Sequence, residues 1–145
     1  MAEMVAFLKA LTPEAKECLG KLIFEIPLFP FRVGRESRRD KSSLFPNSRR
    51  RHHSSPNNDL YLADSGNRLN ISREHFQIER RGDAFFLVDR HSACGTLVEG
   101  ETIGRDRNGG EVRLGNGDVI IVGTSESRQI FKFLTEMGVG PTDRL

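Results

Sequence analysis

The sequence predicts an all-β fold, an antiparallel β-sandwich of two packed sheets with a short N-terminal helical segment. After Gly20, short runs rich in β-branched and aromatic residues follow one another, each bounded by Gly, Asn or Asp. Polar and apolar residues alternate within residues 76–79 and 130–133, as in strands that have one buried and one exposed face. The 145 residues suit one domain of this kind.

The first segment, residues 1–20, is predicted to be a helical extension. Thr12 offers an N-cap, Pro13 a first-turn proline and Glu14 an early carboxylate, and Gly20 ends the pattern. We expect two short helices, or one helix broken at the proline, packed either on the domain itself or on a partner. The apolar residues that recur at helix spacing before the proline are Met4, Val5, Phe7, Leu8 and Leu11.

Residues 21–134 are predicted to form the sandwich. Arg81-Gly82-Asp83 and Asn116-Gly117 are predicted to be hairpin turns, because Gly and Asn accept the positive φ that such turns require. The expected strands are residues 21–26, 31–34, 60–63, 75–80, 84–89, 95–98, 111–114, 119–123 and 128–134.

Two segments carry no pattern of regular structure: residues 36–58, a long basic loop, and residues 135–145, a tail. The basic loop either attracts phosphate-rich partners or is merely solvated. Nucleic-acid binding there is disfavoured because aromatic residues for stacking are scarce, and His52-His53 lacks the Cys or carboxylate partners of a metal site. The cations of the loop are Arg38, Arg39, Lys41, Arg49, Arg50 and Arg51.

The remaining composition indicates a cytoplasmic protein. Cys18 and Cys94 lie far apart without metal-ligand spacing, which predicts reduced thiols rather than a disulfide framework. The longest apolar runs are far shorter than the roughly 18 residues that span a bilayer, and the N-terminus has no signal-peptide pattern. We expect no metal, no cofactor and no membrane association.

Several spaced motifs occur in one order along the predicted strands. Gly34-Arg35 ends one strand, Ser72-Arg73-Glu74-His75 opens another, and residues 95–100, Gly-Thr-Leu-Val-Glu-Gly, follow Asp89 and Ser92. Asn58-Asp59-Leu60 opens a strand between the first two motifs, and residues 114–123 form a final turn and apolar strand. In this arrangement, residues 21–134 resemble the forkhead-associated (FHA) domain family.

The resemblance implies a non-catalytic signalling adaptor that binds phosphothreonine, with Arg35, Ser72 and Arg73 contacting the phosphate. The expected partner is a phosphothreonine-containing protein, with a Ser/Thr kinase or its substrate as the candidate class. Phosphothreonine presents close to two negative charges and three acceptor oxygens. A guanidinium fork and a hydroxyl are suitable donors for these oxygens.

Four further residues are implied to support the site: Gly34, His75, Gly95 and Thr96. His75, with Ser72 and Asp89, could also suggest a Ser-His-Asp hydrolase. We disfavour that reading because the sequence has no nucleophile elbow or other acyl-transfer motif. We therefore expect His75 to brace the binding loops.

The implied peptide-binding loop departs from the family pattern at Ala93, Cys94 and Glu99. Cys94 stands where the family has an Asn that contacts the peptide main chain, and a thiol is a weak donor and acceptor. Glu99 replaces a second Asn and would place a carboxylate near the peptide. The alternative hypothesis is therefore an FHA-like scaffold used for phosphate-independent protein–protein interaction.

Overall fold

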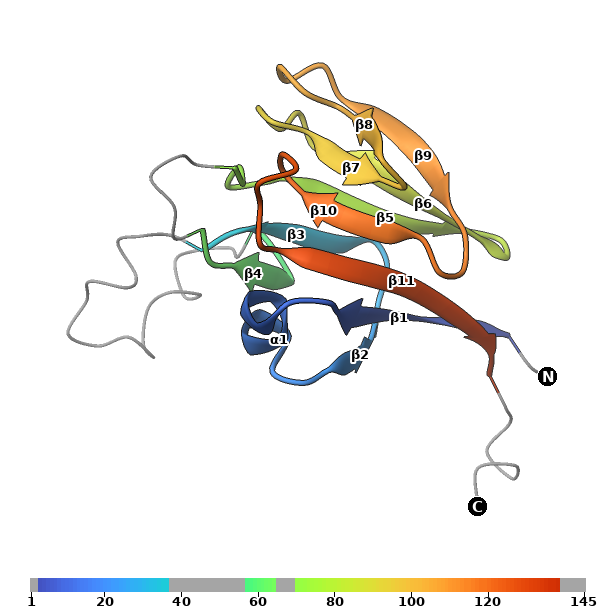
Figure 1. Cartoon of the computed structure of the whole chain (residues 1–145). Helices are drawn as coiled ribbons and strands as arrows, with labels where there is room; N and C mark the ends of the chain where they lie inside the picture. Colours follow the sequence, from blue (N-terminus) through green and yellow to red (C-terminus); the bar gives the residue numbers. More distant parts are fainter. Residues whose placement is uncertain (1–2, 37–56, 65–69, 139–145) are drawn as a thin grey trace.

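The computed structural model describes residues 3–36, 57–64 and 70–138, which form a sandwich of two β-sheets with one short helix (Figure 1). The predicted all-β sandwich is thereby confirmed. The elements are β1 (Met4–Ala10), α1 (Pro13–Leu19), β2 (Ile23–Glu25), β3 (Phe31–Arg35), β4 (Leu60–Leu62), β5 (Phe76–Arg81), β6 (Ala84–Asp89), β7 (Thr96–Val98), β8 (Glu101–Ile103), β9 (Gly110–Leu114), β10 (Val119–Val122) and β11 (Ile130–Met137).

The strands form a six-stranded sheet, in the order β2-β1-β11-β10-β7-β8, and a five-stranded sheet, in the order β4-β3-β5-β6-β9. Neighbouring strands are antiparallel except β3 and β4, which are parallel, so the five-stranded sheet is mixed. Arg81 pairs with Ala84 across a two-residue turn, which confirms the hairpin predicted at residues 81–83. The turn at Asn116-Gly117 is not a hairpin: β9 pairs with β6 and β10 with β7 and β11, so this turn carries the chain from one sheet to the other.

The core lies between the two sheets, where alternate residues of each strand point inward. Phe31, Phe76, Phe131 and Phe133 are almost fully buried there. Fully burying one such side chain stabilises the fold by about 1.5–3 kcal/mol. The loops at the end of the sandwich are therefore carried by a rigid packed body.

The helical prediction for the first residues is wrong, because Met4–Ala10 is strand β1, paired with β11 and β2. Ala6, Leu8 and Ala10 are buried at every second position. Apolar side chains on the outer face, such as Phe7, obscured this alternation in the sequence. Residues 3–20 thus pack as part of the sandwich and are not a separate extension.

Helix α1 forms where it is predicted and packs on the domain itself. The Thr12 hydroxyl oxygen accepts a hydrogen bond from the Ala15 N–H at 3.1 Å, and Gly20 ends the helix in a left-handed conformation at φ 82°. Ala15 and Leu19 are buried, and the helix contacts β1 and β4.

Strand β8 has no counterpart among the predicted strands, because only Ile103 of its three residues is buried. Strand β11 continues to Met137, so the predicted tail at residues 135–145 begins inside a strand. The rest of that tail, residues 139–145, and most of the basic loop, residues 37–56, lie outside the described residues.

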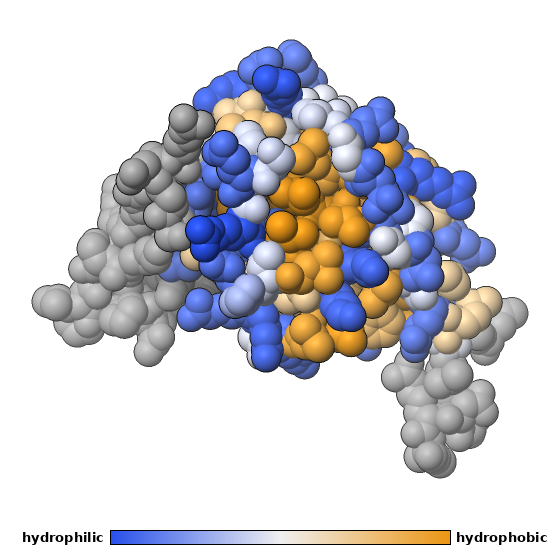
Figure 2. Space-filling view, viewed as in Figure 1, coloured by the Kyte–Doolittle hydropathy of each residue, from blue (hydrophilic) through white to orange (hydrophobic). Residues whose placement is uncertain are grey.

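The outer face of the six-stranded sheet carries a broad apolar area (Figure 2). It includes the half-buried outward residues of β1, β7, β10 and β11. Within the described residues, no helix has the length and apolar character to cross a membrane.

Candidate functional site

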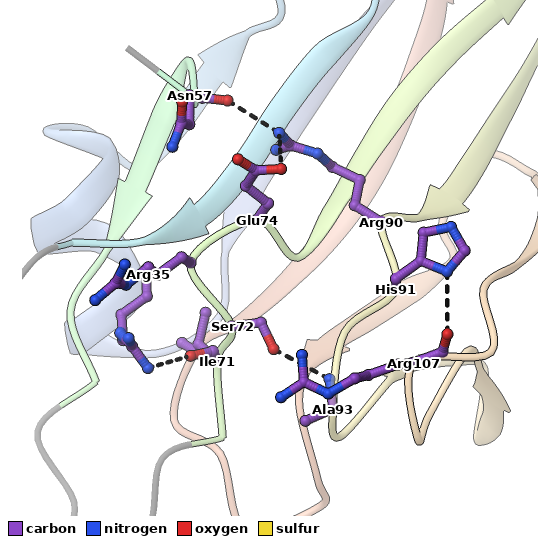
Figure 3. Close-up of a pocket in the computed structure, with 10 residues that line it drawn as sticks. Arg35, Asn57, Ile71, Ser72, Glu74, Arg90, His91, Ala93 and Arg107 are labelled. Carbon is purple, nitrogen blue, oxygen red and sulfur yellow. Dashed lines mark hydrogen bonds and ion pairs between the residues drawn. The ribbon is translucent and has the colours of Figure 1, made fainter. Parts of the chain in front are cut away.

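The end of β3 and the loops before β5, between β6 and β7, and between β8 and β9 meet at one end of the sandwich, from the left to the upper left of Figure 1. They surround an open cavity of about 600 Å³ (Figure 3). Its lining residues are Arg35, Asn57, Ile71, Ser72, Arg73, Glu74, Arg90, His91, Ala93 and Arg107.

Ser72 is held by hydrogen bonds on three sides. Its carbonyl accepts the Arg35 N–H at 3.0 Å, and its own N–H donates to His75 Nδ1 at 2.9 Å. Its Oγ accepts the Ala93 N–H at 3.1 Å, which joins the loop before β5 to the loop before β7. Because Oγ acts here as acceptor, the hydroxyl proton can still be donated into the cavity.

Arg35 ends β3 and is half-buried at the cavity wall. Its Nη1 donates to the carbonyl of Ile71 at 3.1 Å, which fixes the plane of the guanidinium. Its Nε is buried, and the described part of the chain offers it no hydrogen-bond partner. The arginine is thus held in place, and its side chain lines the cavity.

His75 lies beneath the loops and is fully buried. Its Nδ1 accepts from Ser72, so its Nε2 carries the proton and donates to the carbonyl of Gly95 at 2.7 Å. Burial lowers the pKa of His75, with partial opposition from the Gly95 carbonyl. The neutral imidazole therefore braces two of the loops that form the cavity.

A second buried cluster holds the loops around β7 and β8. The Asp89 carboxylate accepts from the Ser92 N–H at 2.9 Å and from the Ser92 hydroxyl. Ser92 Oγ in turn accepts the Gly95 N–H at 3.0 Å. Any side chain on Gly104 would collide with the Asp89 carboxylate, so the start of the β8–β9 loop lies directly against this cluster.

The wall opposite Ser72 is made by Arg90. Its Nη1 donates to Asn58 Oδ1 at 2.6 Å, and its Nη2 donates to the Asn57 carbonyl at 3.1 Å and lies 3.3 Å from a Glu74 carboxylate oxygen. Burial lowers the pKa of Arg90, and the charge of Glu74 partly offsets this. Arg90 is consequently committed to holding the loop that precedes β4.

Of the residues predicted to bind, Arg35, Ser72, Arg73 and Ala93 line the cavity together. Cys94 does not line it; with Ala93 it lines an adjoining cavity of about 470 Å³. The supporting residues Gly34, His75, Gly95 and Thr96 are buried behind the loops.

Glu99 does not line either cavity. It lies in the turn between β7 and β8, where its carboxylate accepts the Val119 N–H at 2.7 Å. The expectation that its charge lies beside a bound peptide at this cavity is therefore not supported by its position.

The structure adds residues that the sequence did not indicate, above all Arg90, His91 and Arg107. No spacing motif marks them. Asn58 could have been found from the sequence, because it stands at the start of a predicted strand. Its Nδ2 donates to the Arg73 carbonyl at 2.8 Å.

Ser72, His75 and Asp89 do not form a catalytic relay. His75 uses its two ring nitrogens on backbone groups, and Asp89 is bonded to Ser92. The described residues also contain no cluster of three His, Cys, Asp or Glu side chains that could hold a metal ion. The site can instead bind an anion through fixed guanidinium and hydroxyl donors.

Comparison with known structures finds the same fold in several solved proteins. Yeast Pml1p matches with a TM-score of 0.61 and 17% identity over 92% of this chain and 83% of that chain. The N-terminal FHA domain of S. cerevisiae Rad53p, solved with a phosphothreonine peptide, matches with a TM-score of 0.54 and 19% identity over 92% and 94% of the two chains.

Mycobacterium tuberculosis EmbR, in complex with a low-affinity phosphopeptide, matches with a TM-score of 0.54 and 22% identity. The match covers 94% of this chain and 25% of the EmbR chain, so this chain spans about a quarter of that protein's length. Comparison with curated protein sequences finds no similar protein. A family model, that of the FHA domain, matches residues 31–123. This match extends from β3 to the end of β10 and takes in the whole cavity, and it assigns the chain to the FHA domain family.

Proposed function

We propose that this chain binds phosphothreonine-containing protein segments in the cavity between its loops and acts as a signalling adaptor without catalysing a reaction. The observation that carries the proposal is the hydrogen bonding of the Ser72 hydroxyl. Its Oγ already accepts the Ala93 N–H, so its proton is directed elsewhere, and Arg35 flanks it on the same cavity wall.

A phosphate monoester matches these donors. It offers three acceptor oxygens and close to two negative charges, and the cavity supplies Arg35, Arg73 and the Ser72 hydroxyl. Charge-assisted hydrogen bonds are worth about 1.5–3 kcal/mol each. Three of them account for most of the roughly 8 kcal/mol of a micromolar complex.

The position of Arg35 supports the same reading. Its side chain lines the cavity together with Ser72, and the bond from its Nη1 to the Ile71 carbonyl holds it there. Within the described residues it forms no ion pair, so its charge is available to an anion in the cavity.

The proposed partner is a protein carrying phosphothreonine, with a Ser/Thr kinase or its substrate as the candidate class. Two solved structures with the same fold, the N-terminal FHA domain of Rad53p and EmbR, hold a phosphothreonine peptide and a phosphopeptide, which supports this class of ligand. The predicted cytoplasmic location stays a prediction.

The test uses two peptides that are identical except for the phosphate on one threonine. Each is titrated with the protein, and binding is measured by calorimetry or fluorescence polarisation. We expect the phosphorylated form to bind about 100-fold more tightly than the unphosphorylated form. Ser72→Ala and Arg35→Ala should each lower its affinity about tenfold or more. Arg113→Ala is the matched control, because Arg113 is an exposed arginine on β9 that does not line the cavity.

Equal binding of the two peptide forms would contradict the proposal. It would favour the alternative of a phosphate-independent interaction scaffold, for which the apolar outer face of the six-stranded sheet offers a surface. A loss of affinity in Arg113→Ala as large as that in Arg35→Ala would indicate only general charge attraction.

A further inference from the structure

Arg107 is a cation of the cavity that lies outside the motifs of the sequence. It lies in the loop between β8 and β9, and its side chain lines the same cavity as Ser72. Figure 3 shows Ser72 between Arg35 and Arg107, with the Arg107 side chain extending toward Ser72 and Ala93. The site thus has a guanidinium on each side of its serine.

The backbone of Arg107 is held on both sides. Its N–H donates to the Ser92 carbonyl at 2.9 Å, and its own carbonyl accepts from His91 Nδ1 at 3.0 Å. The preceding residue, Asp106, donates its N–H to the Ala93 carbonyl at 2.8 Å. Arg107 is therefore anchored to the loop between β6 and β7, and its side chain starts from a fixed point at the cavity rim.

The loop between β8 and β9 has an unfavourable backbone conformation at Arg107 and the two residues before it. Arg105, Asp106 and Arg107 have φ values of 110°, 54° and 63° in succession. Residues other than Gly, Asn or Asp rarely adopt a positive φ. Such strain persists where the surrounding structure enforces it, and it is concentrated at binding and catalytic sites.

The charges of the cavity exceed what one phosphate requires. Four arginines and one glutamate line it, a formal excess of three positive charges. Glu74 pairs with Arg90, whereas Arg35, Arg73 and Arg107 form no ion pair within the described part of the chain. A phosphothreonine supplies only about 1.5 to 2 negative charges, which leaves roughly one cation without a counter-charge.

The size of the cavity points the same way. Its volume of about 600 Å³ is that of a pocket for a drug-sized ligand, and a single phosphate group fills only part of it. If the phosphate of a peptide lies between Arg35 and Ser72, the part of the cavity on the Arg107 side of Ser72 is open to the residues beside the phosphothreonine.

We infer that Arg107 binds a second acidic group of the ligand, so that the site selects phosphothreonine segments with an Asp, a Glu or another phosphorylated residue close by. This inference rests on the proposed function. It adds a preference for negative charge in the ligand sequence around the phosphothreonine.

The experiment uses four labelled peptides in fluorescence polarisation. Three carry one phosphothreonine and differ only in flanking residues, which are acidic, neutral or basic; the fourth is the acidic peptide without phosphate. They are titrated against the wild-type chain, Arg107→Gln, and the matched control Arg113→Gln, which removes the same charge from an exposed position on β9. Thermal melts check that each variant is folded.

We expect the wild-type chain to bind the acidic phosphopeptide about tenfold more tightly than the neutral one. Arg107→Gln should remove most of this advantage while it changes the affinity for the neutral phosphopeptide little. Arg113→Gln should keep the advantage.

The opposing outcomes separate two failures. If the wild-type chain prefers phosphorylated peptides but Arg107→Gln weakens all of them equally, or none, the role given to Arg107 is wrong and the proposed function stands. If the unphosphorylated acidic peptide binds as well as its phosphorylated form, the proposed function fails, and the inference fails with it.

Discussion

The carbonyl oxygen of Arg73 occupies the space that a side chain on Gly34 would need. A Cβ on Gly34 would collide with this oxygen and would also lie 2.6 Å from Asn58 Nδ2, which is bonded to the same carbonyl. The last turn before β5 can approach β3 this closely only because Gly34 has no side chain. The glycine before Arg35 thus sets the distance between the arginine and Ser72.

Gly34→Ala should therefore damage both stability and binding. The colliding atom belongs to the backbone, so no rotamer change relieves the contact, and we expect a loss of about 3 kcal/mol in the free energy of unfolding. Urea denaturation measures this. Gly115→Ala is the control, because its new Cβ would meet only the Asp118 carboxylate at 3.7 Å, an ordinary contact. Similar losses in the two variants would refute the close-approach argument.

The buried His75 should make stability depend on pH. Burial lowers its pKa in the folded chain, so the unfolded chain binds the proton more tightly. Its stabilising contribution is complete above the unfolded pKa of about 6.5 and is lost as the pH falls below that value, by at most about 1.4 kcal/mol per pH unit.

Denaturation curves of the wild-type chain and of His75→Gln at pH 7.5 and pH 5.5 check this. Most carboxylates keep their charge across this range, so the comparison isolates the imidazole. The free-energy difference between the two proteins should shrink at the lower pH. A difference that stays constant would show that His75 does not titrate differently on folding.

Much of the site could be predicted from sequence because its motifs are local. Gly34-Arg35 and residues 72–75 are each a short continuous stretch, so they can be recognised in the sequence without knowledge of the fold. Arg107 could not be found this way, because it reaches the cavity only through the pairing of β7 with β8 and the bonds of its loop to Ser92 and Ala93. These depend on contacts between segments distant in sequence.

The first strand escaped prediction for a different physical reason. Strand β1 has apolar residues on both faces: Ala6 and Leu8 are buried in the core, while Val5 and Phe7, at the alternate positions, are half-buried. With Lys9 as the only polar residue of this strand, period 2 cannot be distinguished from helical spacing. The pairing of β1 with β11 makes this segment a strand, and that pairing joins residues far apart in the sequence.

Glu99 should contribute to stability and not to ligand affinity. Its carboxylate accepts the Val119 N–H at 2.7 Å at a distance from the cavity, which ties the β7–β8 turn to β10. Glu99→Ala should lower the free energy of unfolding by about 1 kcal/mol, less than a buried charge-assisted bond contributes, because Glu99 is exposed to solvent. Phosphopeptide affinity should not change. A gain in affinity for acidic peptides in this variant would instead place the carboxylate near the ligand.

Cys94 stands where the family pattern has an asparagine. Cys94 and Ala93 line the cavity that adjoins the proposed phosphate site, so a side chain at position 94 lies near the path of a peptide leaving that site. An asparagine there offers two strong donors and an acceptor where the thiol has only weak ones. Cys94→Asn should therefore raise phosphopeptide affinity, by up to about tenfold for one added hydrogen bond.

Calorimetry with the phosphorylated peptide measures the gain, and Cys94→Ser is the matched control, since a hydroxyl is polar but shorter than the amide. The unphosphorylated peptide should gain less, because without its phosphate it is not held in register beside position 94. If Cys94→Asn and Cys94→Ser leave affinity unchanged, the peptide does not pass this side of the cavity, and the path toward Arg90 on the opposite wall becomes the one to test.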